Sequence, residues 1–194
     1  MSNIVLQLLS TSEQLLQQEI KKTNLPPIEN HKICLVYGKK LAQAYKIDLD
    51  FIAACLNFMD VKIGQTVQEN RRQDHIQMSL DATLKAIRPI NLDSKTITKI
   101  RGCILSHHGA DPYPSIEAEI CANADCFKFL HPRGLLVFIA DLGRRGMKFN
   151  ELLNFAKEKI EEKMATISLP EVKPEAKEYY RNLIKLINAA QKQF

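Results

Sequence analysis

Six side chains of types that bind metal ions are spread over the first two thirds of the chain, mostly beside expected helix ends or breaks. They are His31, Asp60, His75, His107, His108 and Asp125. Imidazole nitrogens and carboxylate oxygens are common ligands of divalent cations, and a buried carboxylate needs a compensating charge. The sequence therefore predicts that these six side chains converge on one metal-binding pocket.

Small residues accompany these side chains on the faces of the expected helices. His31 shares a face with Gly38 and Ala42, and Asp125 shares one with Ala122. Small side chains let helix backbones approach closely, so that short His and Asp side chains from different helices can meet. This pattern favours a shared site between packed helices.

Each candidate ligand also has a simpler interpretation. A single histidine on an apolar face is commonly a hydrogen-bonded core residue. His107 and His108 could form a helix C-terminal cap favoured by the helix dipole, and Asp125 could pair with Lys128. The order of the whole set along the chain is more specific than any one member.

The elements that must position these residues are helices. Apolar residues recur with a period of 3.6 in nearly every segment, and alternation typical of strands is rare. The predicted fold class is all-α. Capping, Gly and Pro signals place helices at about residues 10–24, 30–45, 48–60, 73–87, 93–108, 115–130, 135–142, 149–166 and after 174.

Composition is that of an ordinary globular protein. The chain has 194 residues, of which 45% are hydrophobic and 25% charged, and it carries a net charge of +5. No apolar run is long enough to span a membrane, no signal peptide is recognised at the start, and no dense Lys/Arg stripe supports nucleic-acid binding. Five cysteines without a C-x-x-C pair indicate buried reduced thiols and a cytoplasmic protein.

The order of the candidate ligands resembles that of the HD superfamily of metal-dependent phosphohydrolases. In that family the order is His, His-Asp, His, one or two His, and Asp. This chain has, in the same order, His31, Met59-Asp60, His75, His107-His108 and Asp125. The resemblance implies an HD-domain-like helical bundle.

Three local segments carry the same resemblance. Segment 58–64, Phe-Met-Asp-Val-Lys-Ile-Gly, is similar to the family's apolar-His-Asp-Ile-Gly segment. Segment 104–108 with the following Tyr113-Pro114 resembles the paired-His region, including that of HD-GYP phosphodiesterases, and segment 117–125 resembles the last ligand-bearing helix. The length of the chain predicts a single domain over residues 1–194. Its HD-like core covers about 28–130, and a C-terminal helical extension covers about 133–194.

The family's ligand pattern implies two metal positions, of which the first is altered here. The first would use His31, the position of Met59, Asp60 and Asp125, and the second would use Asp60, His75, His107 and His108. Met59 replaces the histidine of the His-Asp pair, and a thioether is a poor ligand for Mn, Fe, Mg or Zn. The second position is complete. Met59 also extends the apolar stripe of Ile52, Cys55 and Leu56, so that it could simply be a core residue.

The resemblance further implies a divalent metal ion (Mn, Fe, Mg, Ni or Zn) and hydrolysis of a phosphate ester of the nucleotide or cyclic nucleotide class. Asp60 and Lys62 are the expected catalytic residues, and Arg71, Arg72 and Lys128 are the expected phosphate contacts because they lie close to the ligands in sequence. A solvated loop is the alternative for Arg71 and Arg72.

Two other functions remain open at this stage. One is a catalytically degenerate HD-like module that binds a ligand or regulates a partner, which Met59 favours. The other is a helical interaction protein without a site. The expected partners are a small phosphorylated substrate or nucleotide and no membrane, and the apolar last helix could serve in a homodimer.

Overall fold

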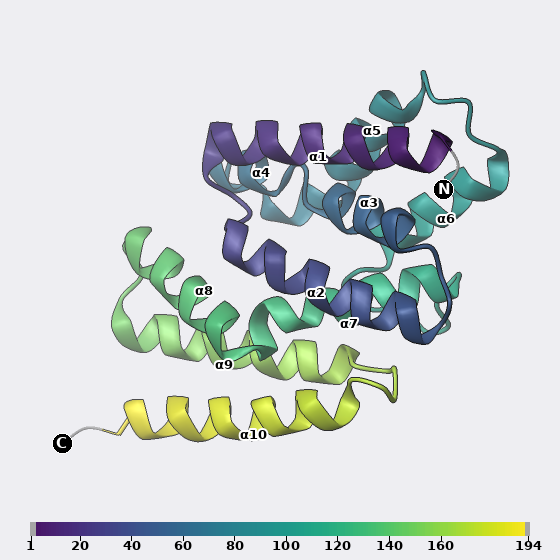
Figure 1. The fold of residues 1–194 in the computed structure, drawn as a ribbon. Helices are drawn as coiled ribbons and strands as arrows, with labels where there is room; N and C mark the ends of the chain where they lie inside the picture. The colour runs from purple at the N-terminus through teal and green to yellow at the C-terminus, as the bar shows by residue number, and fades with distance from the viewer. Residues whose placement is uncertain (1–2, 193–194) are drawn as a thin grey trace.

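The computed structural model describes residues 3–192, and within this range it contains α-helices and one 3-10 helix but no β-strand (Figure 1). The elements are α1 (Asn3–Thr23), α2 (Ile28–Ala44), α3 (Leu49–Met59), α4 (Ile63–Gln68), η1 (Arg72–Asp74), α5 (His75–Ile87), α6 (Ser94–Leu105), α7 (Ile116–Leu130), α8 (Pro132–Arg144), α9 (Phe149–Thr166) and α10 (Lys173–Ala190). The predicted all-α class is confirmed. Of the predicted domain 1–194, residues 1–2 and 193–194 lie outside the described range. No helix in that range is both long and apolar enough to cross a bilayer.

Two of the expected helices differ clearly in their bounds, and α4 was not expected from the sequence. The first helix begins at Asn3 and not near residue 10, because its buried face, which includes Leu8 and Leu16, extends toward the N-terminus. The helix expected over 93–108 ends at Leu105, so that His107 and His108 lie on the turn that follows α6. This turn allows two consecutive histidines to face the same site.

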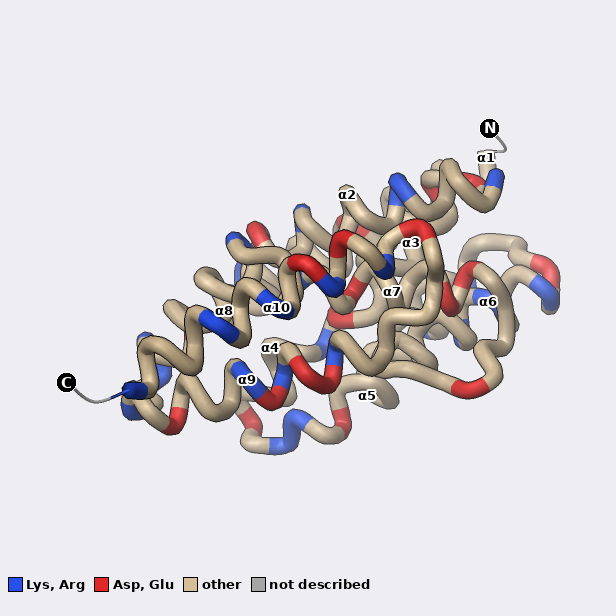
Figure 2. Tube along the Cα trace, turned by 90° about the horizontal axis from the view of Figure 1, so that it is seen from below, with Lys and Arg blue, Asp and Glu red and all other residues tan. Residues whose placement is uncertain are grey.

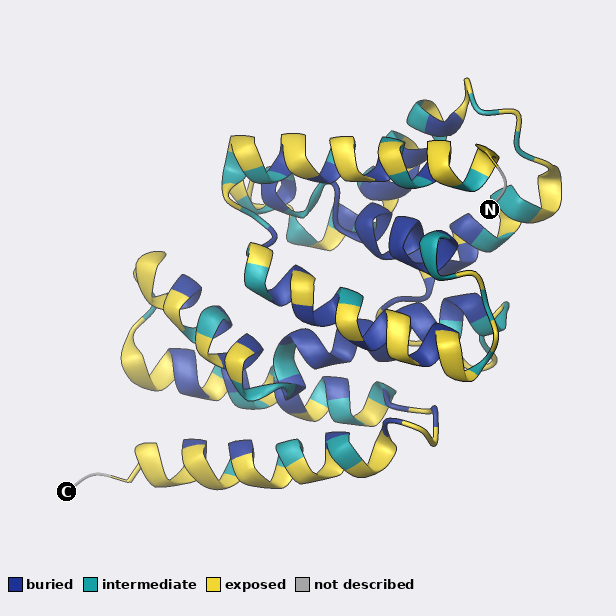
Figure 3. Ribbon diagram, in the orientation of Figure 1, coloured by how far each residue is buried: buried dark blue, intermediate teal, exposed yellow. Residues whose placement is uncertain are grey.

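Helices α3 and α7 form the centre of the molecule. Every residue of α3 from Phe51 to Met59 is buried, and most of α7 is buried as well (Figure 3). A helix that is covered on all sides must lie inside the core. On α2, Tyr37 stacks on Phe127 of α7 with ring centroids 3.5 Å apart. This stacking fixes α7 relative to α2.

The C-terminal helices pack on this centre. Figure 1 shows α8, α9 and α10 along one side of α7. Asn123 of α7 accepts hydrogen bonds from the backbone N–H groups of Ser168 and Leu169, at 3.0 and 3.1 Å. Glu175 at the start of α10 accepts hydrogen bonds from Tyr37 and Lys40 of α2. The connection from α9 to α10 is therefore held at both ends.

Charges are mixed over the surface. Lys and Arg positions are interspersed with Asp and Glu positions along the described helices, without one continuous basic band in the view of Figure 2. This distribution agrees with the lack of a basic stripe in the sequence.

Gly134 allows α7 and α8 to meet closely. The side-chain amide of Asn30 donates to the carbonyl oxygens of Lys128, at 3.0 Å, and of Gly134, at 3.3 Å. A Cβ atom on Gly134 would lie 2.4 Å from the carbonyl oxygen of Lys128, so the backbone would have to move. The junction therefore requires glycine.

We expect Gly134→Ala to lower the free energy of unfolding by about 1–3 kcal/mol, as overpacking typically does. Gly143→Ala in the same helix is the matched control, because its added Cβ would meet only Leu152, at 3.9 Å. Urea unfolding of both variants measures the difference. Equal stability of the two variants would contradict this account of the junction.

Candidate metal centre

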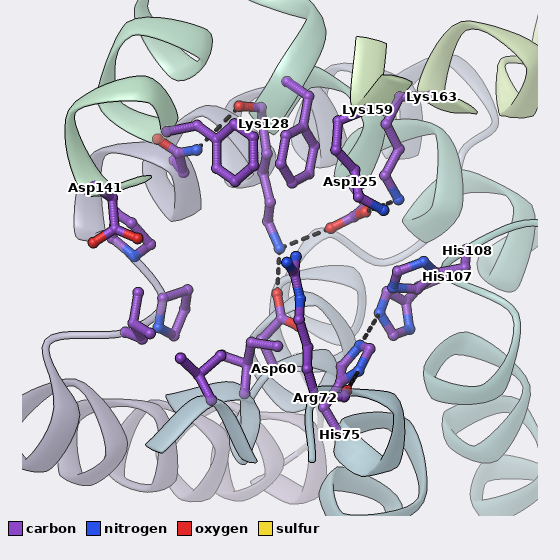
Figure 4. Close-up of a pocket in the computed structure, with 18 of the residues that line it drawn as sticks. Asp60, Arg72, His75, His107, His108, Asp125, Lys128, Asp141, Lys159 and Lys163 are labelled. Carbon is purple, nitrogen blue, oxygen red and sulfur yellow. Dashed lines mark hydrogen bonds and ion pairs between the residues drawn. The ribbon is translucent and has the colours of Figure 1, made fainter. Parts of the chain in front are cut away.

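A cavity of about 80 Å³, open to solvent, lies between α7, α8 and α9 on one side and α4 and α5 on the other (Figure 4). Its polar lining residues are Asn30, Asp60, Arg72, His75, His107, His108, Asp125, Lys128, Asp141, Arg145, Lys159 and Lys163. Its apolar wall consists of Leu25, Pro26, Pro27, Ile63, Val67, Phe129 and Phe138.

In His75 and His107, one ring nitrogen is hydrogen-bonded to the backbone and the other faces the neighbouring histidine ring. His75, at the start of α5, has Nδ1 at 2.8 Å from the carbonyl oxygen of Arg72. His107 has Nδ1 at 2.7 Å from the carbonyl oxygen of Ile104. A carbonyl oxygen only accepts, so we assign the proton of each neutral ring to Nδ1. The two Nε2 atoms, 3.4 Å apart, then turn lone pairs toward each other.

The third ring, that of His108, completes this group. Its centroid lies 4.3 Å from that of His107 and 5.2 Å from that of His75. Its Nδ1 atom is 3.6 Å from a carboxylate oxygen of Glu162 on α9. One ligand atom from each of the three histidines lies within 4.8 Å of the others. We call His75, His107 and His108 the histidine trio.

The trio fits a bound divalent ion. Metal-bound histidines almost always direct their other ring nitrogen at a carbonyl or carboxylate, as His75 and His107 do. Tetrahedral binding at about 2.0–2.1 Å separates two nitrogen ligands by about 3.4 Å, and the Nε2 atoms of His75 and His107 are 3.4 Å apart. Three imidazoles suit Zn, Fe or Ni better than Mg.

His107 and His108 do not readily take up a proton. Burial lowers the pKa of His107. Burial, followed by the nearby charge of His107, lowers the pKa of His108 to about 3. Both rings are therefore neutral at ordinary pH, and their free lone pairs remain available to a cation.

Beside the trio, two carboxylates and two ammonium groups alternate in a buried row. Lys128 Nζ lies 2.5 Å from Asp60 Oδ2 and 2.8 Å from Asp125 Oδ1. Lys163 Nζ lies 2.9 Å from Asp125 Oδ2. None of the four residues is more than 8% exposed. We call Asp60, Lys128, Asp125 and Lys163 the ion-pair row (Figure 4).

The row keeps its members charged. Burial by itself raises the pKa of the Asp60 and Asp125 carboxyls, but Lys128 and the other basic groups nearby together outweigh it and hold both pKa values well below the usual range. Burial likewise lowers the pKa of Lys128, and the two carboxylates more than reverse this effect. The site therefore contains fixed charges.

His31 does not line the cavity with the other predicted ligands. Its Nε2 atom is 2.7 Å from Asn57 Oδ1, and the amide of Asn57 donates to Ser12 Oγ at 2.9 Å. Since the amide oxygen accepts, His31 Nε2 carries a proton and is not free to bind a metal, and the Nδ1 atom of this ring is buried without a hydrogen-bond partner. The expectation that all six residues share one pocket is thus corrected for His31, because partners on α1 and α3 hold its ring. Met59 is fully buried in the core.

Two of the predicted basic residues also lie elsewhere. Lys62 donates to the side chain of Gln65 at 3.1 Å and is not among the lining residues. Arg71 pairs at the surface with Asp74, at 2.9 Å, and with Glu69, at 3.7 Å. These short local partners hold both side chains outside the cavity. Lys128 does line it, within the ion-pair row.

Arg72 is the basic residue best placed for an anion. Figure 4 shows its side chain pointing into the cavity, and its guanidinium lies 5.9 Å from the centroid of the Phe155 ring. No carboxylate of the described chain is within ion-pair distance of it. Burial, followed by the charge of Arg145, lowers the pKa of its guanidinium. Five basic and three acidic side chains line the cavity as a whole.

The sequence analysis missed the residues that the C-terminal helices contribute. Lys159, Glu162 and Lys163 come from α9, and Asp141 comes from α8. Lys163 left a signal, because it continues the apolar face of α9 at the spacing expected for a buried residue. The others have no such signal in the sequence.

Comparisons with known proteins bear on the fold. No family model matches the sequence, and no curated protein matches it. The structure is similar to the crystal structure of a predicted HD superfamily hydrolase from an uncultured Thermotogales bacterium. The TM-score is 0.62 at 12% identity, over 94% of this chain and 88% of that chain. The chain therefore has an HD-domain-like fold, as the resemblance implied, and the similarity includes the C-terminal helices.

Proposed function

We propose that this protein is a metal-dependent phosphohydrolase that binds one divalent ion, Zn, Fe or Ni, at the histidine trio and cleaves a phosphate ester. The observation that carries the proposal is the convergence of three imidazole rings, two of which direct Nδ1 at a backbone carbonyl oxygen while the third has Nδ1 3.6 Å from a carboxylate oxygen. The HD-domain-like fold, shared with a protein described as a predicted hydrolase, supports it.

A divalent ion at the trio would polarise a phosphoryl oxygen and add positive charge beside the reacting phosphorus. Arg72 is free to form a bidentate contact with two further phosphate oxygens. Asp60 stays ionised, and its Oδ1 atom has no hydrogen-bond partner in residues 3–192, so it can accept a hydrogen bond from an attacking water molecule and orient it. Lys128 stabilises the negative charge of Asp60.

The cavity also supports a proposal for the substrate. Its apolar wall, which includes Phe129 and Phe138, can receive the organic part of an ester, while its basic residues receive the phosphate. We propose a small substrate of the nucleotide or cyclic nucleotide class. All five cysteines are free and buried, which supports a reducing compartment, and we propose the cytoplasm.

The test is metal-dependent hydrolysis. Protein stripped with a chelator is reloaded with Zn, Fe(II), Ni or Mn and assayed on p-nitrophenyl phosphate, bis(p-nitrophenyl) phosphate and nucleoside monophosphates. We expect hydrolysis that requires metal and is lost in His75→Ala. A protein that takes up none of these ions would contradict the proposal.

We expect Arg72→Ala to weaken binding of inorganic phosphate, and to raise KM, by about 10–100-fold, because a hydrogen bond to a charged group contributes about 1.5–3 kcal/mol. Arg71→Ala is the matched control, since Arg71 pairs with Asp74 outside the cavity and its loss leaves both quantities unchanged. Phosphate inhibition constants measure the effect. Equal losses in the two variants would place the anion elsewhere.

A second candidate function is a binding module without turnover. The ion pairs of Lys128 with both carboxylates, together with Met59 in the core, favour it. It predicts that metal-loaded protein binds a nucleoside phosphate by calorimetry and releases no phosphate over hours. Turnover that is lost in Asp60→Asn would exclude it.

A further inference from the structure

The ammonium group of Lys128 occupies a position between two carboxylates. It contacts Asp60 Oδ2 at 2.5 Å and Asp125 Oδ1 at 2.8 Å, and the three residues come from the end of α3 and from α7. Two buried carboxylates this close to each other require a cation between them. In this chain a side chain provides that cation.

We propose that Lys128 is a built-in replacement for a second metal ion, so that the chain binds one divalent ion at the histidine trio and none between Asp60 and Asp125. The ion count rests on the proposed function, whereas the role of Lys128 does not. A lysine supplies one positive charge at this place whether or not metal is available.

Few other donors remain to assist a metal here. His31 Nε2 is bonded to Asn57 Oδ1, which leaves the unpartnered Nδ1 atom of that ring, and the thioether of Met59 is buried in the core. Lys163 contacts the remaining oxygen of Asp125 at 2.9 Å. A metal would therefore find few free ligand atoms between the carboxylates unless an ammonium group left.

The backbone around Lys128 is fixed as well. Its carbonyl oxygen accepts from the side-chain amide of Asn30 at 3.0 Å, and Gly134 packs against the same oxygen. The side chain is only 4% exposed. Moving the ammonium group away would bury two unpaired carboxylates, so the resident cation is stable in its position.

The proposal is tested in a His107→Ala background, where the trio no longer binds metal. We expect His107→Ala to bind no Mn²⁺, and His107→Ala/Lys128→Ala to bind about one Mn²⁺ per chain, because carboxylate oxygens suit this ion. Equilibrium dialysis with elemental analysis gives the count, and the rise of the Tm on addition of Mn²⁺ gives an independent readout. Adding Asp60→Asn to the double variant should abolish both the Mn²⁺ binding and the rise of the Tm. The double variant His107→Ala/Lys128→Arg should bind no Mn²⁺, because arginine keeps a positive charge at this position.

Absence of Mn²⁺ uptake by folded His107→Ala/Lys128→Ala would overturn the proposal. If that variant folds only with metal, its Mn²⁺-dependent folding is itself the supporting result. The number of metal ions bound per wild-type chain is a further test, and it does not depend on the folding of a variant. Two ions per wild-type chain, one of them lost in Asp60→Asn, would show that metal displaces Lys128. If the histidine trio binds no metal, the wild type takes up none, while His107→Ala/Lys128→Ala still binds Mn²⁺. Failure of the proposed function can thus be distinguished from failure of the proposed role of Lys128.

Discussion

Replacing His107 by alanine is expected to release the bound divalent ion, whereas replacing His31 by glutamine leaves the metal content unchanged. His107 Nε2 lies 3.4 Å from His75 Nε2 at the centre of the trio, and His31 is bonded to Asn57. Loss of an outer-shell partner alone weakens metal binding by about 10–100-fold, so loss of a ligand should weaken it by at least about 100-fold. Elemental analysis after reloading with Zn measures the result.

The two variants, His107→Ala and His31→Gln, distinguish a metal site that includes His31 from one that does not. The family resemblance puts His31 among the ligands, and the structure puts it beside α1 and α3. Glutamine at position 31 can still donate to Asn57, so the fold should be retained, which circular dichroism checks. Release of the metal by His31→Gln would show that the ring turns into the cavity when metal binds.

Replacing Lys163 by methionine is expected to lower the free energy of unfolding by about 3–5 kcal/mol, the usual result of removing one partner of a buried ion pair. Lys163 is 1% exposed and contacts Asp125 Oδ2 at 2.9 Å. Methionine is also unbranched and is only one atom shorter than lysine, so the expected loss of stability comes mainly from removal of the charge. Urea unfolding, followed by circular dichroism, measures it.

Lys157→Met is the matched control for this prediction. Lys157 belongs to the same helix and donates to Asn188 at the surface, at 3.2 Å. Surface substitutions usually change stability by less than about 0.5 kcal/mol. If both variants lose the same amount of stability, the buried pair is not what attaches α9 to α7.

Much of the fold could be predicted from the sequence because its signals are local. The expected helix over 149–166 coincides with α9, and the one expected over 115–130 begins as predicted, with Ser115 capping α7. Helix α4 was missed because Gly64 and polar residues are typical of a break. There, glycine serves the approach of α1: a Cβ atom on Gly64 would lie 1.9 Å from Thr23 Oγ1. That contact is tertiary and leaves no local pattern.

The candidate site could be predicted only in part for the same reason. Helix ends and the family pattern indicated His75, His107 and His108, which the structure brings together. The orientation of His31 depends on Asn57 and Ser12, which lie on other helices, and no periodicity reveals that contact. Sequence proximity to the ligands selected both Arg71 and Arg72, although only Arg72 faces the cavity.

The opposed lone pairs of His75 and His107 have a consequence for how much of this protein a cell would maintain. Two acceptor atoms 3.4 Å apart repel each other until a cation separates them. Binding that is confined to the folded state stabilises it, by about 2.7 kcal/mol when the free ion is at 100 times its dissociation constant. Proteases act on the unfolded fraction, so such a stabilisation changes abundance severalfold. We therefore expect the steady-state level of the protein to rise and fall with the supply of its metal.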